Sequence, residues 1–307
     1  MEIANPIYDV VFKYMMEDNS VARLLVSAII GEKVISLEPK PQERTKEKDN
    51  DKSLFPDNLT VYRLDFSANI ETAEGTKLVL IEMQKASFHT DIMRFRGYLG
   101  QQYMDEKNST LDEDEKVEAI QIYSIYFLGD DLKIHDTPVL SIFPEVMDVA
   151  TKEIVNAKSK FIEALNHKCW VVQISCLKQR RRNELEHLLM AFDQSNREGN
   201  NKHILSVNEE DIPEKYRPLF RRLKMAASSK EVKRLMKKED DDMAYIKDLL
   251  RVRSNEVARE KDKIIAQKDE TIAQKDEAIT QGRKENETLR QEIERLRKEN
   301  QTMISKK

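Results

Sequence analysis

The sequence predicts an α/β fold in which helices flank a central mixed sheet, followed by a helical region and a C-terminal coiled coil. Helical and strand-like patterns alternate along residues 1–180, as is typical of an α/β or α+β unit. Within that part, two apolar segments flank the turn sequence AEGT and predict a β-hairpin. A near-exact seven-residue repeat near the C-terminus predicts a long helix.

The composition is that of a globular protein. A chain of 307 residues suggests one or two units large enough for an apolar core. Its two cysteines, Cys169 and Cys176, flank Trp170 at a spacing that fits neither a zinc ribbon nor a redox pair. We expect both to be reduced thiols in the core.

Charge and hydropathy exclude several classes of protein. The first residues lack the basic start and apolar core of a signal peptide, and no stretch approaches about 18 apolar residues, so we expect a cytoplasmic protein without membrane contact. The net charge is −4, which gives no global signature of nucleic-acid binding. The strongest basic cluster, KQRRRNE at 178–184, fits either a contact to a DNA backbone or the solvated start of a helix.

The first elements follow from apolar spacing. Residues 5–30 have helical periodicity, with Asn5 as the expected cap, Pro6 in the first turn and Gly31 at the end. The charged, proline-containing segment 38–58 predicts a loop.

The hairpin comes next. Residues 60–72 and 77–85 read as two strands joined at Gly75, and residues 89–106 then have helical spacing. A polar hairpin or short helix is expected near 145–160. Further predicted strands are VEAIQIYSIYFL (117–128), PVLSIF (138–143) and CWVVQISC (169–176).

The pattern changes after the last of these strands. From residue 178 onward it is helical throughout. We therefore expect three parts: a core over 1–180, a helical extension over 181–245, and a long helix over 246–307.

The C-terminal repeat predicts a coiled-coil seam that is sound only in its final part. Position d holds Leu289, Leu296 and Met303 late in the repeat, but Lys268, Lys275 and Gly282 earlier. A solvated single helix is the alternative to a pairing helix. The residues at position a are Ile265, Ile272, Ile279, Asn286, Ile293 and Asn300.

Three polar residues interrupt the apolar hairpin strands. Glu82 and Gln84 are two apart and project to one face of their strand, and Asp65 lies at a comparable distance from the turn. Two carboxylates in a partly buried site repel each other unless a cation lies between them. A divalent metal with oxygen ligands meets that need, and metal-assisted phosphodiester hydrolysis follows as a reaction class.

Several motifs together resemble a known family. They are DVVFKYMM near the N-terminus, RLDFSANI and IEMQ in the hairpin, the helix carrying Arg94, Tyr98 and Tyr103, and the strand AIQIYSIYFL. In this order the set resembles the PD-(D/E)xK nuclease superfamily, closest to its nuclease-family transposases or recombination-promoting nucleases. The resemblance covers roughly residues 5–130 and implies a restriction-endonuclease-like core.

The resemblance also assigns residue roles. It implies that Asp65 and Glu82 bind a metal, with Asp9 completing the site, and that the metal is Mg²⁺ or Mn²⁺. It places Gln84 at the position of the superfamily's lysine, which is a departure because an amide only hydrogen-bonds. Lys13, Arg94 and Tyr98 become candidates for DNA phosphate contacts.

Two functions compete on this evidence. The first is a Mg²⁺-dependent DNA endonuclease with Asp65, Glu82 and Gln84 as catalytic residues, paired as a homodimer or larger homo-oligomer through the coiled coil. The second is a catalytically inactive nuclease-like module that binds DNA or another partner as an oligomer. The resemblance as a whole favours the first, and the missing lysine, the acidic balance and the long heptad tail favour the second to a lesser extent.

Overall fold

The structure, a computed structural model, divides into two compact units, Met1–Glu239 and Asp240–Lys307. It describes residues 1–40, 65–84, 89–111, 117–129, 131–134, 136–155 and 159–304. Most of the predicted loop at 38–58 and the first residues of the predicted strand at 60–72 lie outside this part of the chain.

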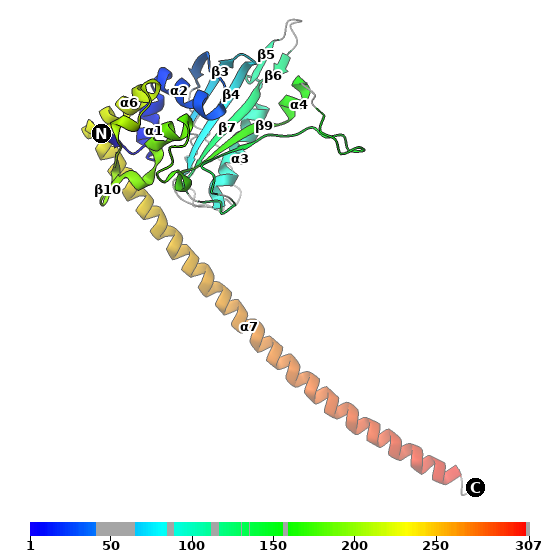
Figure 1. The fold of residues 1–307 in the computed structure, drawn as a ribbon. Coiled ribbons are helices and arrows are strands. Elements are labelled where there is room, and N and C mark those ends of the chain that lie inside the picture. Colours follow the sequence, from blue (N-terminus) through cyan, green and yellow to red (C-terminus); the bar gives the residue numbers. More distant parts are fainter. Residues whose placement is uncertain are drawn as a thin grey trace. The chain divides into compact units, whose positions relative to one another are not determined.

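A six-stranded mixed sheet forms the centre of the first unit (Figure 1). Its strand order is β2-β3-β4-β7-β9-β8, in which β4, β7 and β9 are parallel and the other neighbours are antiparallel. The prediction of an α/β fold with a central mixed sheet is thus confirmed. The strands are β2 (Ser36–Pro39), β3 (Phe66–Thr72), β4 (Gly75–Gln84), β7 (Gln121–Leu128), β8 (Val139–Ile142) and β9 (His167–Gln173).

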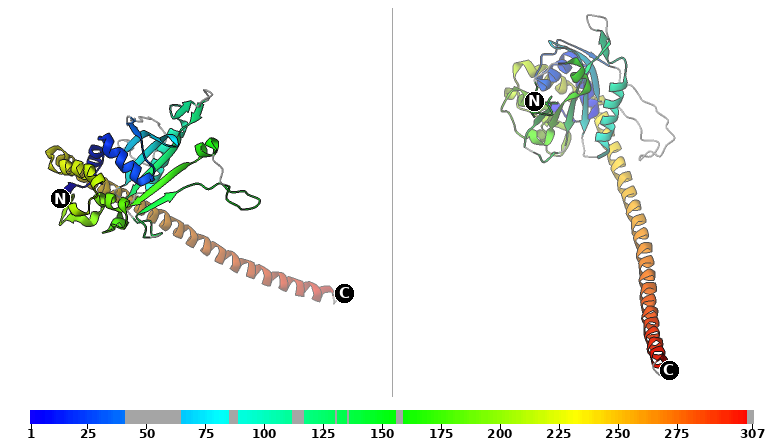
Figure 2. Two further views of the ribbon diagram at one scale, coloured as in Figure 1. Left: turned by 45° about the horizontal axis from the view of Figure 1, so that its top comes forward. Right: turned by 90° about the vertical axis from the view of Figure 1, so that its right-hand side faces the viewer.

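Helices cover both faces of this sheet, which explains why β4 and β7 are almost continuously apolar. The larger core lies on the face covered by α1 (Asp9–Met16), α2 (Asn19–Ile30), α5 (Glu184–Leu189) and α6 (Arg217–Ser228). A smaller core lies under α3 (His89–Met104) on the opposite face (Figure 2).

The helix predicted over residues 5–30 is two helices. Asp18 interrupts it, because its carboxylate accepts hydrogen bonds from the N–H groups of Ser20 and Val21 and caps α2. Asn5 does not cap a helix but is buried, and its amide donates to Gln194. Gly31 ends α2 as predicted, in the left-handed conformation with φ +74°.

The apolar periodicity predicts helix throughout the segment after residue 178, and this prediction is wrong. It contains β10 (Arg197–Glu198) and β11 (Asn201–Ser206), and β11 pairs with the N-terminal strand β1 (Glu2–Ala4). The pairing satisfies the backbone hydrogen-bonding groups of β1, a strand too short to be recognised from its sequence, and it joins the segment to the core. Short 3-10 turns lie at Ile174–Leu177, Met190–Phe192, Gln194–Asn196, Glu209–Asp211 and Glu214–Tyr216.

The remaining elements lie at the margin of the first unit. Strands β5 (Ser109–Leu111) and β6 (Val117–Ala119) form a separate pair, and α4 (Lys160–Leu165) precedes β9. One bridge between Met147 and Ile154 gives the predicted polar segment a hairpin form. Cys169 and Cys176 are free, as predicted, with Cys176 buried and Cys169 partly buried.

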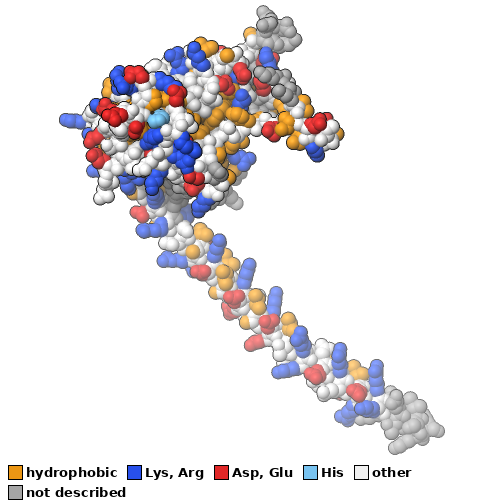
Figure 3. All heavy atoms as spheres, in the orientation of Figure 1, with side chains coloured by type: hydrophobic (Ala, Val, Ile, Leu, Met, Phe, Trp, Pro, Cys, Tyr) orange, Lys and Arg blue, Asp and Glu red, His pale blue; other side chains and the backbone are white. Residues whose placement is uncertain are grey.

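The C-terminal helix α7 (Lys230–Ile304) has 75 residues and begins in the first unit, where Val232 and Met236 are part of the larger core. In the second unit most of its described apolar side chains are exposed and lie among charged ones (Figure 3). The predicted long helix is therefore present. No helix within the described part of the chain is long and apolar enough to cross a membrane.

Candidate active site

The hairpin of β3 and β4 brings Asp65 beside Glu82. The pairing of the two strands ends with Phe66 opposite Ile81. Asp65 and Glu82 are the next residues beyond this pair, so they lie opposite each other where the ladder ends. The carboxylate of Asp65 accepts a hydrogen bond from the backbone N–H of Met83, which fixes it at the end of β4. At the other end of the hairpin Gly75 has φ +99°, a conformation that favours glycine.

Glu82 and Gln84 face the side of the sheet that α3 covers. Leu78 and Leu80 belong to the small core under this helix, and alternation along β4 carries the next two even-numbered side chains to the same face. Both polar side chains are buried, with 1% of Glu82 and 8% of Gln84 exposed. Burial of this degree shows that neither is an ordinary surface residue of a half-exposed strand.

Tyr126 holds Gln84 in place. Its hydroxyl donates a hydrogen bond to Oε1 of Gln84, and its ring packs edge-on against Phe95 with 5.1 Å between centroids. Tyr126 lies on β7 directly beside Glu82. Its place in the site could not be predicted from the sequence, because it depends on the β4–β7 register.

Helix α1 contributes Asp9 and Lys13 from the other side of the sheet. Phe12 packs against Phe127 near the end of β7, with 5.9 Å between ring centroids, so this helix lies at the same end of the strands as Glu82. Lys13 Nζ lies 2.6 Å from Asp9 Oδ2. Asp9 Oδ1 is buried and has no hydrogen-bond partner among the described residues.

Glu239 also reaches this helix. Tyr8 is the N-cap residue of α1, but its side chain makes no capping hydrogen bond. The carboxylate of Glu239 accepts a 3.0 Å hydrogen bond from the backbone N–H of Asp9, and an acidic group at a helix N-terminus is stabilised by the helix dipole. Sequence reasoning missed this contact because 230 residues separate the two positions.

The charges of these residues act on one carboxyl group. Burial raises the pKa of Asp65 well above its usual range, and the negative charges of Glu82 and Asp9 raise it further. The Met83 N–H and the charge of Lys13 lower this pKa and offset part of the effect. Asp65 therefore lies within electrostatic reach of two other carboxylates singled out in the sequence, Glu82 and Asp9, and of Lys13.

The predicted residues of α3 lie in different surroundings. Tyr98 is buried, which favours packing over an exposed contact surface. Arg94 lies in the helix, but its side chain is outside the described part of the structure. Tyr103 is hydrogen-bonded to His167 at the beginning of β9, whereas Glu82 lies near the end of β4. The motif that links these three positions in the sequence does not bring Tyr103 to the carboxylates.

The donor chemistry of the cluster fits a hard divalent cation. Carboxylate oxygens are the ligands that Mg²⁺ prefers, and the buried Asp9 Oδ1 lacks a donor in the described structure. The fit is limited to a site with few protein ligands, because no group of three His, Cys, Asp or Glu side chains among the described residues is arranged to hold a metal. Mg²⁺ commonly takes one or two carboxylates and completes its shell with water and phosphate oxygens.

The basic cluster at 178–184 is largely neutralised by ion pairs. Arg180 pairs with Asp136, and Arg181 lies 3.3 Å from buried Asp193. In the same segment Arg182 Nη2 lies 2.6 Å from a carboxylate oxygen of Glu186. These contacts favour a structural role of the arginines within the protein over a contact to DNA.

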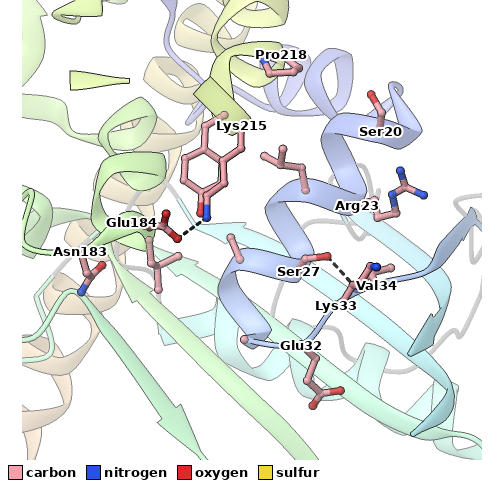
Figure 4. Close-up of a pocket in the computed structure, with 15 residues that line it drawn as sticks. Ser20, Arg23, Ser27, Glu32, Lys33, Val34, Asn183, Glu184, Lys215 and Pro218 are labelled. Carbon is pink, nitrogen blue, oxygen red and sulfur yellow. Dashed lines mark hydrogen bonds and ion pairs between the residues drawn. The ribbon is translucent and has the colours of Figure 1, made fainter. Parts of the chain in front are cut away.

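A separate hollow of about 870 Å³ lies beside α2 (Figure 4). Its lining includes Arg23, Lys33 and the ion-paired Glu184 and Lys215. None of the predicted site residues lines it. The candidate site is thus a cluster at the end of the hairpin and not this cavity.

Comparison of the chain with protein-family models, curated proteins and solved structures gave no match. The resemblance to the PD-(D/E)xK superfamily consequently stays a prediction, and any function has to be inferred from the site itself.

Proposed function

We propose that the protein is a Mg²⁺-dependent DNA endonuclease of the transposase or recombination-promoting type, with a restriction-endonuclease-like core. The observation that carries this proposal is the convergence of Asp65 and Glu82 at the end of the hairpin, with Asp9 and Lys13 beside them. Buried like charges destabilise a fold, and carboxyl groups perturbed in this way are typical of functional sites.

Asp65 and Glu82 are the proposed metal ligands, and Asp9 is the third carboxylate of the site. Bound Mg²⁺ or Mn²⁺ would supply Lewis-acid stabilisation of the phosphoryl oxygens and a lowered pKa of a bound water. Two direct carboxylate ligands are a number that Mg²⁺ commonly takes from a protein.

Gln84 and Tyr126 have positioning roles in this proposal. Gln84 orients the attacking water by a hydrogen bond, and Tyr126 fixes the Gln84 amide through its hydroxyl. An amide carries no charge, so the positive charge that a lysine would supply must come from another residue. Lys13 is the proposed source, because its charge already acts on Asp65.

DNA is the proposed partner. Lys13 and Arg94 are the proposed phosphate contacts, because both belong to helices that flank the end of the hairpin. Tyr98, which is buried, supports the helix by packing. Two copies joined through α7 would carry two sites, which suits cleavage of both strands of one duplex.

Plasmid cleavage tests the nuclease proposal. Wild-type protein is expected to convert supercoiled DNA to nicked and linear forms with Mg²⁺ but not with EDTA. Asp65→Ala and Glu82→Ala should each reduce the rate at least about a hundredfold, the size of effect seen when a group that stabilises the transition state is lost. Glu74→Ala, in the exposed hairpin turn, is the matched control and should cleave as the wild type does.

A second function is a nuclease-like module without turnover. The ion pair of Lys13 with Asp9 favours this second function, because it engages the proposed source of positive charge within the protein itself. The neutral Gln84 favours it as well. Thermal denaturation with Mg²⁺ or Mn²⁺ separates the two: the endonuclease is stabilised by metal in a manner that depends on Asp65, whereas an inactive scaffold without a metal site is not.

A further inference from the structure

The C-terminal helix presents an apolar stripe whose flanks are charged in a particular order. Leu289, Ile293 and Leu296 recur at alternating spacings of four and three residues, and each is between 51% and 57% exposed in the single chain. Such spacing places them on one face of α7, at positions d, a and d of the heptad. Half-exposed leucine and isoleucine along one face are typical of a helix that pairs with another helix.

The charges beside this stripe are segregated by heptad position. Glu285 and Glu292 occupy position g, and Arg290 and Arg297 occupy position e. All four are exposed. In a parallel, in-register dimer, position g of one helix faces position e of the next heptad in the other helix.

This order distinguishes the two orientations of a homodimer. In the parallel arrangement Glu285 of one copy meets Arg290 of the other, and Glu292 meets Arg297, so every such contact is attractive. In an antiparallel arrangement g faces g and e faces e, so glutamate meets glutamate and arginine meets arginine. The charge order thus selects the parallel dimer and penalises the antiparallel one.

The seam favours the same arrangement. Asn286 lies at position a, where a polar residue fixes the register by meeting its own counterpart. In the single chain its amide donates only within the helix, to the backbone oxygen of Gly282 at 3.2 Å. Ile293 at a, with Leu289 and Leu296 at d, is the combination that favours two strands over three or four.

The earlier heptads carry no comparable charge order. Asp269 and Asp276 occupy position e, but the g positions that would face them are Ile264 and Thr271. Lysines at d also weaken that part of the seam. Orientation is consequently determined by residues 285–297.

We propose that α7 pairs with α7 of a second copy as a parallel, in-register, two-stranded coiled coil over residues 285–297. The inference rests on the pairing of two copies in the proposed function and adds its orientation. A parallel coil places both N-terminal units at the same end of the dimer. Both candidate active sites would then lie at that end, which suits cleavage of both strands of one duplex.

Disulfide trapping in the full-length chain tests the orientation. Leu289→Cys lies in the seam, and Gln291→Cys lies at the outward position f two residues away. The parallel, in-register dimer predicts a covalent dimer from Leu289→Cys under mild oxidation, and none above the wild-type background from Gln291→Cys. No covalent dimer from Leu289→Cys, or equal yields from the two variants, would overturn the proposal.

Charge reversal provides an independent test by analytical ultracentrifugation. Glu285→Arg/Glu292→Arg turns every interhelical pair of the parallel dimer repulsive and should raise its dissociation constant at least about tenfold. An equimolar mixture with Arg290→Glu/Arg297→Glu should restore dimerisation. In an antiparallel dimer the first variant has as many like-charge contacts as the wild type, so unchanged dimerisation would contradict the parallel arrangement. Neither test measures cleavage, so failure of the nuclease proposal remains distinguishable.

Discussion

At the scale of single residues, the proposed function and the stability of the fold make opposite demands on Asp65. Its carboxylate accepts a hydrogen bond from the Met83 N–H, and burial together with the charges of Glu82 and Asp9 raises its pKa. A carboxyl group with a raised folded-state pKa destabilises the fold above that pKa, and this cost disappears below the unfolded-state pKa, where the group is protonated in both states. Asp65 should therefore reduce stability at neutral pH.

Asp65→Asn tests this. The amide oxygen still accepts from the Met83 N–H, while the negative charge is removed. We expect the variant to be more stable than the wild type by about 1 kcal/mol at pH 7 in metal-free buffer. The difference should shrink as the pH falls through the raised pKa and vanish below the usual range of Asp. Urea denaturation across pH measures it, and a destabilised variant at pH 7 would contradict the account.

Tyr126→Phe tests the support of Gln84. Loss of the hydroxyl leaves the Gln84 oxygen without this donor, so the amide is less well oriented. We expect cleavage to slow by about tenfold or more, because a misplaced positioning group costs transition-state stabilisation. Metal-linked thermal stabilisation should stay as in the wild type, because Asp65 and Glu82 are untouched. Loss of metal binding together with cleavage would assign Tyr126 a different role.

At the scale of elements, much of the fold could be predicted from local patterns. The hairpin, α3 and β8 coincide closely with the predicted segments, because their apolar residues recur at the period of a buried strand or an amphipathic helix. The strand predicted over 117–128 is instead two strands, β6 and β7, which belong to different sheets. The strand predicted over 169–176 begins earlier, as β9, and its last residues form a 3-10 turn. The face shared by Glu82 and Gln84 followed from alternation alone. What could not be predicted depends on pairing distant in sequence: β1 with β11, Tyr126 beside Glu82, and Glu239 at α1.

The break between α1 and α2 shows a different limit. The apolar periodicity runs across this break, but the carboxylate of Asp18 accepts hydrogen bonds from two backbone N–H groups and starts a new helix. Asp18→Ala should cost about 1 kcal/mol of folding free energy, as is usual for loss of an N-cap. Urea denaturation with Asp18→Asn as the matched control measures this cost, and the asparagine variant should stay close to the wild type. Equal stability of Asp18→Ala and the wild type would indicate that the cap contributes little.

At the scale of the whole molecule, we expect the two units to have separable roles. The first has its own core, to which the first turns of α7 contribute Val232 and Met236. A chain ending at residue 250 keeps these turns and loses the heptads. We expect it to fold with nearly the wild-type melting temperature but to sediment as a monomer. An unchanged mass relative to the full chain would show that another surface pairs the copies.

The central claim is that Asp65 and Glu82 form a metal-dependent phosphodiesterase site. Its most direct test is a supercoiled-plasmid time course with Mg²⁺, with wild type and Glu82→Gln compared at equal concentration. Glu82→Gln preserves the shape of the side chain and removes its charge. The account predicts that the wild type produces nicked and then linear DNA while Glu82→Gln leaves the plasmid supercoiled. Equal cleavage by the two proteins, or no cleavage by the wild type with either Mg²⁺ or Mn²⁺, would contradict it.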